Sequence, residues 1–177
     1  MKKTPFLLAI MLTSSLLVTA CNRGSSDNPA DSGGGTATGS GTMSATVDGQ
    51  SWTATSGTVF ATYSTNTLTV IGSQVQGTSA STFNITINNV TGTGEFRLGF
   101  PGVGGAQGIA VYGIGTSAGL TQAWATTNTE TGTVNITRLD VPNKTVAGTF
   151  SFRCRSTNNA TPEIRNITNG RFEARWQ

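Results

Sequence analysis

Polar and apolar residues alternate along most of the chain, and this alternation is the feature that most restricts its fold. Residues 82–87 read TFNITI and residues 132–137 read GTVNIT, with an apolar side chain at alternate positions. Successive side chains of a β-strand point to opposite faces, so a period of two indicates strands with one buried and one wetted face. No stretch of a dozen residues shows the 3.6-residue period of an amphipathic helix. The sequence therefore predicts an all-β protein.

Short turn sequences separate the predicted strands. Asp48-Gly49 lies between two alternating runs. A two-residue hairpin turn needs a positive φ at both central residues, and Asp and Gly tolerate it. The same reasoning predicts a hairpin at Asn169-Gly170, and Pro142-Asn143 predicts a turn between two further strands. Strands at roughly 8–12-residue spacing are typical of sandwiches and barrels. We predict a single antiparallel β-sandwich of about ten strands, with a calycin-like β-barrel as the alternative.

The predicted core consists of the large apolar residues of the alternating runs. They are Trp52, Phe60, Leu68, Val70, Phe83, Ile85, Ile87, Phe96, Leu98, Ile109, Val111, Trp124, Val134, Ile136, Phe150, Phe152, Ile167 and Phe172. Cys154 follows two of these phenylalanines at alternate positions, so its side chain shares their face. We therefore expect a buried, unreactive thiol at Cys154.

The N-terminus has the anatomy of an export signal. Lys2 and Lys3 precede an apolar run at residues 6–18, which is shorter than the roughly 20 residues that span a bilayer. Val18-Thr19-Ala20-Cys21 resembles the lipobox of bacterial lipoproteins. That resemblance implies cleavage before Cys21 and acylation of this cysteine, and two or more acyl chains anchor a protein stably to a membrane. Asn22 stands where Asp commonly signals inner-membrane retention in didermic bacteria, which implies the outer membrane.

These features divide the chain into three expected parts. Residues 1–20 are the signal peptide, and residues 21–41 are the lipidated cysteine with a Gly/Ser-rich tether. A flexible coil of about 20 residues has a typical reach of about 25 Å. Residues 42–177 form the all-β domain, held in water at the cell envelope.

The composition excludes several kinds of chemistry. The chain has no histidine, which excludes Ser-His-Asp catalysis and histidine-ligated metals. Residues 115–119 match the G-x-S-x-G string of serine hydrolases, but a serine without a base is a poor nucleophile. Glycosidases need two carboxylates flanking one bond, and Glu95, Glu130 and Asp140 are the candidates for such a site. We predict no catalytic residue, no cofactor and no metal ligand.

Charge gives little indication of a partner. The formal net charge of +3 falls to +1 once Lys2 and Lys3 leave with the signal, too little to predict a nucleic-acid partner. Arg171, Glu173 and Arg175 share one face of a predicted strand. This interleaving predicts cross-strand ion pairs on a solvated sheet.

The densest glycine run, residues 99–108, is predicted to be a long connection. Function concentrates on loops held by a rigid scaffold, so the alternative is a binding loop in which Phe100 makes the main contact. The residues of this possible binding loop are Phe100, Gly102, Gly104, Gly105 and Gln107.

Much of the predicted β-domain resembles a family of bacterial exported lipoproteins with a single β-rich domain and no assigned function. The resemblance rests on residues 132–140 (GTVNITRLD), residues 144–152 (KTVAGTFSF), residues 167–172 (ITNGRF) and residues 47–52 (VDGQSW). It implies a β-rich lipoprotein domain and supplies no catalytic residues.

We therefore expect a lipid-anchored cell-envelope domain that acts as a non-enzymatic binding or structural interaction module. Besides the membrane, the expected partner is an unidentified envelope protein, a glycan or a small apolar ligand. One alternative is a barrel that binds a small apolar ligand, with residues 99–108 at its mouth. A carboxylate-based envelope hydrolase is the less favoured alternative.

Overall fold

The computed structural model describes residues 41–158 and 162–176. The signal peptide, the lipobox with Cys21 and the tether predicted from the sequence lie outside the described residues. The strands are β1 (Thr42–Val47), β2 (Gln50–Thr53), β3 (Phe60–Ser64), β4 (Thr67–Gln76), β5 (Ser79–Ile87), β6 (Gly94–Leu98), β7 (Gly108–Thr116), β8 (Gly119–Ala125), β9 (Gly132–Asp140), β10 (Thr145–Ser156) and β11 (Ile164–Arg175). The all-β prediction is confirmed. None of the residues that the structure describes form a helix long and apolar enough to cross a membrane.

All eleven strands belong to one sheet, in the order β2-β1-β11-β10-β9-β6-β7-β5-β4-β3. The first strand, β1, lies between β2 and the last strand, β11. Pairing is antiparallel except between β6 and β7, which meet in parallel at Leu98 and Gly108. β8 pairs with β7 along its length and with β10 at its end. The two ends of the order, β2 and β3, are not paired with each other within the described residues, whereas β8 links β7 to β10 and so closes a ring with β9 and β6.

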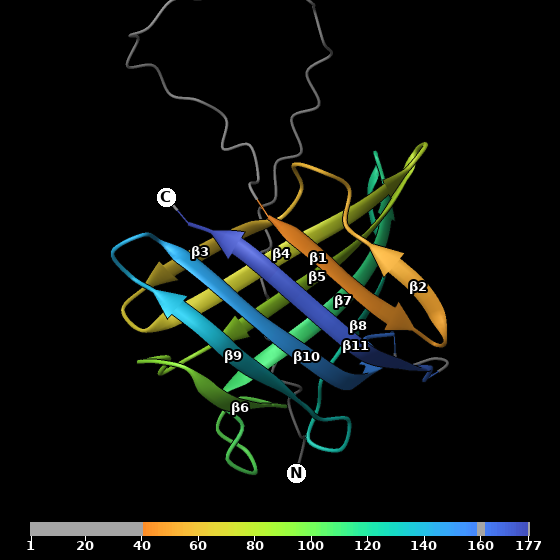
Figure 1. Ribbon diagram of the computed structural model, residues 1–177. Helices are drawn as coiled ribbons and strands as arrows, with labels where there is room; N and C mark the ends of the chain where they lie inside the picture. The colour runs from red at the N-terminus through yellow and green to blue at the C-terminus, as the bar shows by residue number, and fades with distance from the viewer. Residues whose placement is uncertain (1–40, 159–161, 177) are drawn as a thin grey trace, which may run out of the picture. The chain divides into compact units, whose positions relative to one another are not determined.

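The sheet folds over into two packed layers (Figure 1). The front layer contains β2, β1, β11, β10, β9 and β6, and the back layer contains β7, β5, β4 and β3 with β8 at its edge. The ring of Phe83 on β5 lies 4.6 Å from that of Trp52 on β2 and 5.6 Å from that of Phe150 on β10, measured between centroids. Aromatic rings therefore fill the space between the layers, and the predicted sandwich is confirmed.

Two of the three predicted turns are present. Asp48 and Gly49 have φ values of 48° and 85° in the connection between β1 and β2, and Pro142-Asn143 lies between β9 and β10. The predicted hairpin at Asn169-Gly170 is wrong, because β11 runs through it without interruption. Asn169 has a φ of 54° and lies beside a shift in the register between β10 and β11. The Asn-Gly pair makes a β-bulge, which also needs a positive φ.

Most of the predicted core is buried, but three of its residues face outward. Phe60 is 36% exposed, and Ile109 and Val111 are half-buried on the outer face of β7. Residues 109–112 are all apolar, so alternation cannot say which of them face inward. Pairing with β5 decides the question, since it places Ala110 and Tyr112 on the buried face, opposite Ile85 and Phe83.

Candidate functional site

A guanidinium stacked on an indole marks one edge of the sandwich. Trp124 is buried near the end of β8, where it pairs with Ser156 of β10 and with Tyr112 of β7. Its ring lies 5.8 Å from the ring of Tyr112. The guanidinium carbon of Arg165, near the start of β11, lies 4.7 Å from the Trp124 ring centroid. Strand ends from both layers therefore meet at this stack.

Two carboxylates hold the Arg165 guanidinium in place. Its Nη1 donates to Oδ2 of Asp48 at 2.9 Å, and its Nη2 lies 3.5 Å from Oε2 of Glu163. Asp48 also accepts a hydrogen bond from the backbone N–H of Asn166 at 2.8 Å. Burial raises the pKa of the Asp48 carboxyl, but the Asn166 and Arg165 hydrogen bonds outweigh burial and hold this pKa below its usual value. The carboxylate of Asp48 is therefore ionised at neutral pH.

Two buried donors in this stack have no acceptor. Among the described residues, two buried side-chain polar atoms have no hydrogen-bond partner, and they are Trp124 Nε1 and Arg165 Nε. By contrast, the indole of Trp52 donates to Oγ of Ser81 at 2.7 Å. A buried polar atom without a partner is uncommon in native proteins and points to a water molecule, an ion or a ligand that completes it.

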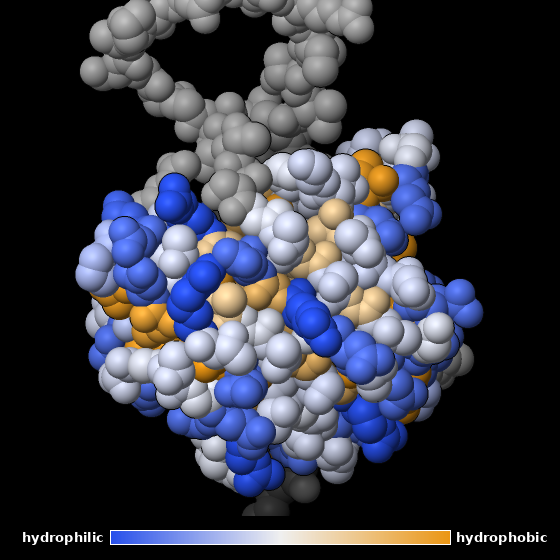
Figure 2. Space-filling view, in the orientation of Figure 1, coloured by the Kyte–Doolittle hydropathy of each residue, from blue (hydrophilic) through white to orange (hydrophobic). Residues whose placement is uncertain are grey.

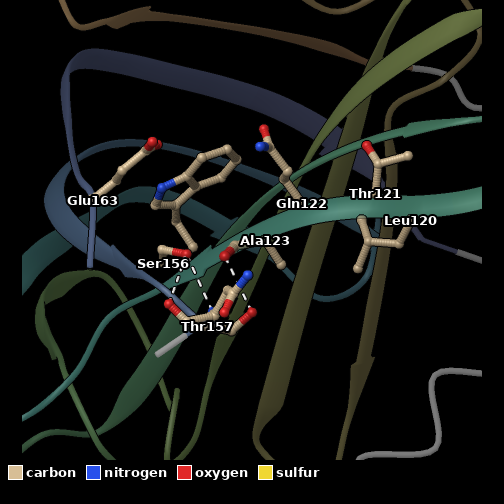
Figure 3. Close-up of a pocket in the computed structure, with 9 residues that line it drawn as sticks. Leu120, Thr121, Gln122, Ala123, Ser156, Thr157 and Glu163 are labelled. Atoms are coloured by element: carbon tan, nitrogen blue, oxygen red, sulfur yellow. Dashed lines mark hydrogen bonds between the residues drawn. The ribbon is translucent and has the colours of Figure 1, made fainter. Parts of the chain in front are cut away.

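A pocket of about 180 Å3 lies beside the stack, and we refer to it as the Trp124 pocket. β8 forms one wall with residues 120–124, and Ser156, Thr157, Asn158 and Glu163 form the other wall (Figure 3). The walls are joined where Thr157 donates its backbone N–H and its hydroxyl to the carbonyl oxygen of Ala123, at 2.8 and 3.2 Å. The volume is below the roughly 300–1,000 Å3 of drug-sized sites, so the pocket suits one small chemical unit.

The chemistry of the Trp124 pocket favours a neutral ligand that accepts hydrogen bonds. Trp124, which lines the pocket, has an unpaired donor, and the unpaired donor of Arg165 lies next to it in the stack. The positive charge of Arg165 is already matched by Asp48 and Glu163, so an anion would gain little there. Gln122 and Thr157 add amide and hydroxyl groups to the walls, and these groups pair with hydroxyls or carbonyls of a ligand.

Sequence reasoning missed this site. Trp124 was expected only in the core, and nothing in one sequence brings it next to Arg165. A signal was nevertheless present, because Arg165 lies two residues before Ile167 and thus on the buried face of β11. A charged residue at an inward position of an alternating strand indicates that something specific contacts it.

The predicted binding loop connects β6 and β7. Its glycines Gly102, Gly104 and Gly105 have φ values of 81°, 61° and 74°. Phe100 is 49% exposed, whereas the backbone of Gln107 is fixed by hydrogen bonds to Arg97 and Asn88. None of the five residues lines the Trp124 pocket. The loop therefore presents one aromatic ring at a separate place, and its binding role stays a prediction.

The three candidate hydrolase carboxylates lie on different elements. Glu95 belongs to β6, Asp140 accepts hydrogen bonds from Asn143 in the turn after β9, and Glu130 precedes β9. Arg155 donates two hydrogen bonds to Glu130 at 3.1 and 3.3 Å. Together with the hydroxyls of two threonines, Arg155 lowers the Glu130 pKa to about 2. Among the described residues, no three Asp, Glu or Cys side chains gather as a metal site requires.

Cys154 is fully buried, and its backbone pairs with Arg165 across β10 and β11. Burial, the largest cause, raises the pKa of the thiol to about 12. A thiol with this pKa is protonated at neutral pH and is a weak nucleophile. The expectation of a buried thiol is confirmed.

Comparison with known proteins gives one match. The model of DUF6252, a domain of unknown function, matches residues 39–174. Neither the curated proteins nor the solved structures contain a match to the chain.

Proposed function

Because the chain belongs to the DUF6252 family, whose role is open, we propose a function from the site itself: a lipid-anchored domain of the bacterial cell envelope that binds a neutral, hydroxyl-rich ligand in the Trp124 pocket. The ligand class is a sugar unit of an envelope glycan. The domain binds this ligand and does not transform it.

One observation carries the proposal. The two buried donors without acceptors, Trp124 Nε1 and Arg165 Nε, belong to a single stack beside a single pocket. An unpaired buried donor costs about 1–3 kcal/mol, and a ligand oxygen that accepts from it recovers part of that energy. Trp124 lines the pocket, whereas Arg165 lies on the Trp124 ring outside the pocket lining. The unpaired indole N–H is therefore the donor that a hydroxyl-bearing ligand in the pocket would satisfy.

The reactive groups of the domain support binding over catalysis. Glu130 is held as an anion by Arg155, so it is unsuited to act as a general acid near neutral pH. The thiol of Cys154 is buried and protonated. The space between the layers is filled by aromatic rings such as Phe83 and Phe152, which favours a ligand at the edge of the sandwich over an apolar ligand inside it.

The lipid anchor is the second part of the proposal and rests on the lipobox. Replacement of Cys21 by Ala should release the protein from membranes into the soluble fraction. A Cys21→Ala protein that stays in the membrane fraction would show that the anchor is elsewhere. Fractionation on a density gradient distinguishes the outer from the inner membrane for the unaltered protein.

The ligand proposal is tested by nuclear magnetic resonance with maltotriose, cellotriose and chitotriose as probes. The chain has three tryptophans, so the three indole N–H signals report on ligand contact one by one. The Trp124 indole N–H signal is identified by its absence in a Trp124→Phe variant. We expect one of the probes to shift this signal and to bind the variant about tenfold more weakly. The proposal fails if none of the probes shifts this signal at about 10 mM, a concentration that detects even weak binding.

A further inference from the structure

Within the described residues, formal charge is confined to the front layer and the connections. No Asp, Glu, Lys or Arg occurs at residues 49–94 or at residues 98–129, and these two stretches supply every strand of the back layer. The outer face of the front layer, by contrast, carries charged side chains among pale hydroxyl-bearing ones (Figure 2). Arg153, Arg171 and Glu173 are exposed there. The two outer faces of the sandwich thus differ in charge: the front face carries ions and the strands of the back face carry none.

The outer face of the back layer is a continuous sheet surface of apolar and uncharged polar side chains. Its central row crosses five strands, each residue paired with the next, and consists of Phe60, Ile71, Asn84, Val111 and Ala125. All five side chains are exposed or half-exposed to solvent. We call this surface the uncharged face.

The uncharged face also holds exposed apolar side chains outside its central row. Val75 is 49% exposed and lies in a row with Ala80, Gly115 and Leu120. Leu120 is 62% exposed, and its side chain covers Gly113. Exposed apolar side chains gathered on one face indicate an interaction surface.

The hydroxyl groups of the uncharged face hydrogen-bond to one another. Thr69 pairs with Thr86 at 3.1 Å between their hydroxyl oxygens, and Ser73 pairs with Thr82 at 2.9 Å. Removing a hydroxyl group from water costs less free energy when the hydroxyl already has a hydrogen-bond partner on its own face. The face can therefore be covered at a small cost in desolvation.

We propose that the uncharged face packs against the same face of a second copy of this chain, as a two-fold symmetric dimer. The strands of this face carry no charged side chain, and the charged residue beside its central row, Arg155 of β10, pairs with Ala125 and is matched by Glu130. A charged partner surface would therefore bury its ions against the centre of the face without a counterion, which is costly. The chain itself supplies a surface without charge, and in a two-fold dimer each copy presents this same surface to the other. Five strands about 4.8 Å apart and about four rows 7 Å apart cover roughly 600 Å2 of flat area, the lower end of the roughly 600–1,000 Å2 that each partner of a stable complex buries.

Sedimentation of the full chain in detergent micelles tests this dimer, with Val111→Arg as the disrupting variant. Val111 lies in the central row, so in the dimer each copy would bury an arginine against strands that carry no counterion. We expect the unaltered chain to be a dimer at about 100 μM and the variant to dissociate at least 100-fold more readily. Thr62→Lys, on the edge strand β3, should weaken the dimer about tenfold with less strain on the fold.

Asn135→Arg is the matched control, because Asn135 is exposed on the outer face of the front layer, opposite Glu95. This variant should dimerise as the unaltered chain does. A monomer for the unaltered chain at about 100 μM overturns the proposal. So does a Thr62→Lys or folded Val111→Arg protein that dimerises normally, or an Asn135→Arg protein that does not dimerise.

Discussion

The Asp48 carboxylate and the Arg165 guanidinium lie 2.9 Å apart, although 117 residues separate them in the chain. Asp48 sits in the turn that joins the first two strands, and Arg165 lies near the start of the last strand. The backbone N–H of Asp48 also donates to the carbonyl oxygen of Asn166 at 2.9 Å. The first hairpin is thereby fixed to the last strand at the edge where the Trp124 pocket lies.

Arg165→Gln should lower the free energy of unfolding by about 1–2 kcal/mol, because it removes a cation–π contact and a partly exposed ion pair. Arg165→Lys keeps the charge but lacks the planar fork that reaches both Asp48 and Glu163, so about half of that loss is expected. Urea unfolding at pH 7 measures both variants. Full stability of Arg165→Gln would show that the contact with Asp48 contributes nothing.

Trp52→Phe and Trp124→Phe remove the same atoms from two buried indoles and should differ in cost. The Trp52 indole donates to Ser81, whereas the Trp124 indole has no acceptor. We expect Trp52→Phe to be the more destabilising by about 1 kcal/mol, the usual net value of one hydrogen bond. Equal losses in urea unfolding would mean that the Trp124 indole has a partner in solution, such as a bound water.

Acid should remove the stabilisation that Glu130 provides. Its carboxyl has a pKa of about 2, below its ordinary value of 4.5, because of hydrogen bonds from Arg155, Thr129 and Thr127. The unfolded chain therefore takes up this proton first as the pH falls, and the stabilisation is lost between about pH 4.5 and about pH 2. It is fully present above this range.

Glu130→Gln isolates this effect from the titration of other carboxyls such as Asp48. At pH 7 we expect a loss of about 1–2 kcal/mol, since a neutral amide is a weaker acceptor from Arg155. At about pH 2 the variant and the unaltered protein should approach each other in stability. If the free energies of unfolding of the variant and the unaltered protein run parallel from pH 7 to pH 2, the pKa of Glu130 is the same in the folded and unfolded states.

Cys154 should react with a thiol reagent only when the protein unfolds. The thiol is fully buried and its pKa is about 12, so both access and ionisation oppose reaction. The measurement uses a Cys21→Ala background, in which Cys154 is the one thiol left. Labelling should be negligible in buffer and complete in denaturant. Rapid labelling of the native protein would contradict the burial of this residue.

Gly132→Ala should be strongly destabilising, whereas Gly92→Ala should be tolerated. A methyl group at Gly132 would lie within 2.3 Å of Phe152 Cβ and of the Ser151 carbonyl oxygen, but nothing lies within 4 Å of a methyl group at Gly92. We expect a loss of about 1–3 kcal/mol or more for the first variant and little change for the second. Thermal unfolding of the two variants side by side decides the matter.

The fold could be predicted largely from the sequence because its main signals are local. Alternation in stretches such as residues 132–137 reports directly on strand type, and Asp48-Gly49 reports on a tight turn. Two predictions failed where a local signal has two solutions. Asn169-Gly170 supplies a positive φ that serves a bulge as well as a hairpin, and the apolar residues 109–112 fit either face of a strand.

The candidate site could not be predicted, because it is made by pairing between distant segments. Trp124 meets Arg165 only after β8 has paired with β10 and β10 with β11. Neither residue carries a sequence motif. The uncharged face is an intermediate case, since the absence of charge is visible in the sequence, but only the strand order shows that the two charge-free stretches form one surface.

The position of β1 between β2 and β11 has a consequence for the order of folding. The front layer needs residues 164–175 before the first hairpin gains its second neighbour. Contacts between segments this far apart raise the contact order, and a high contact order slows folding. In a chain that emerges with its N-terminus first, β1 therefore lacks its second neighbour until β11 has emerged.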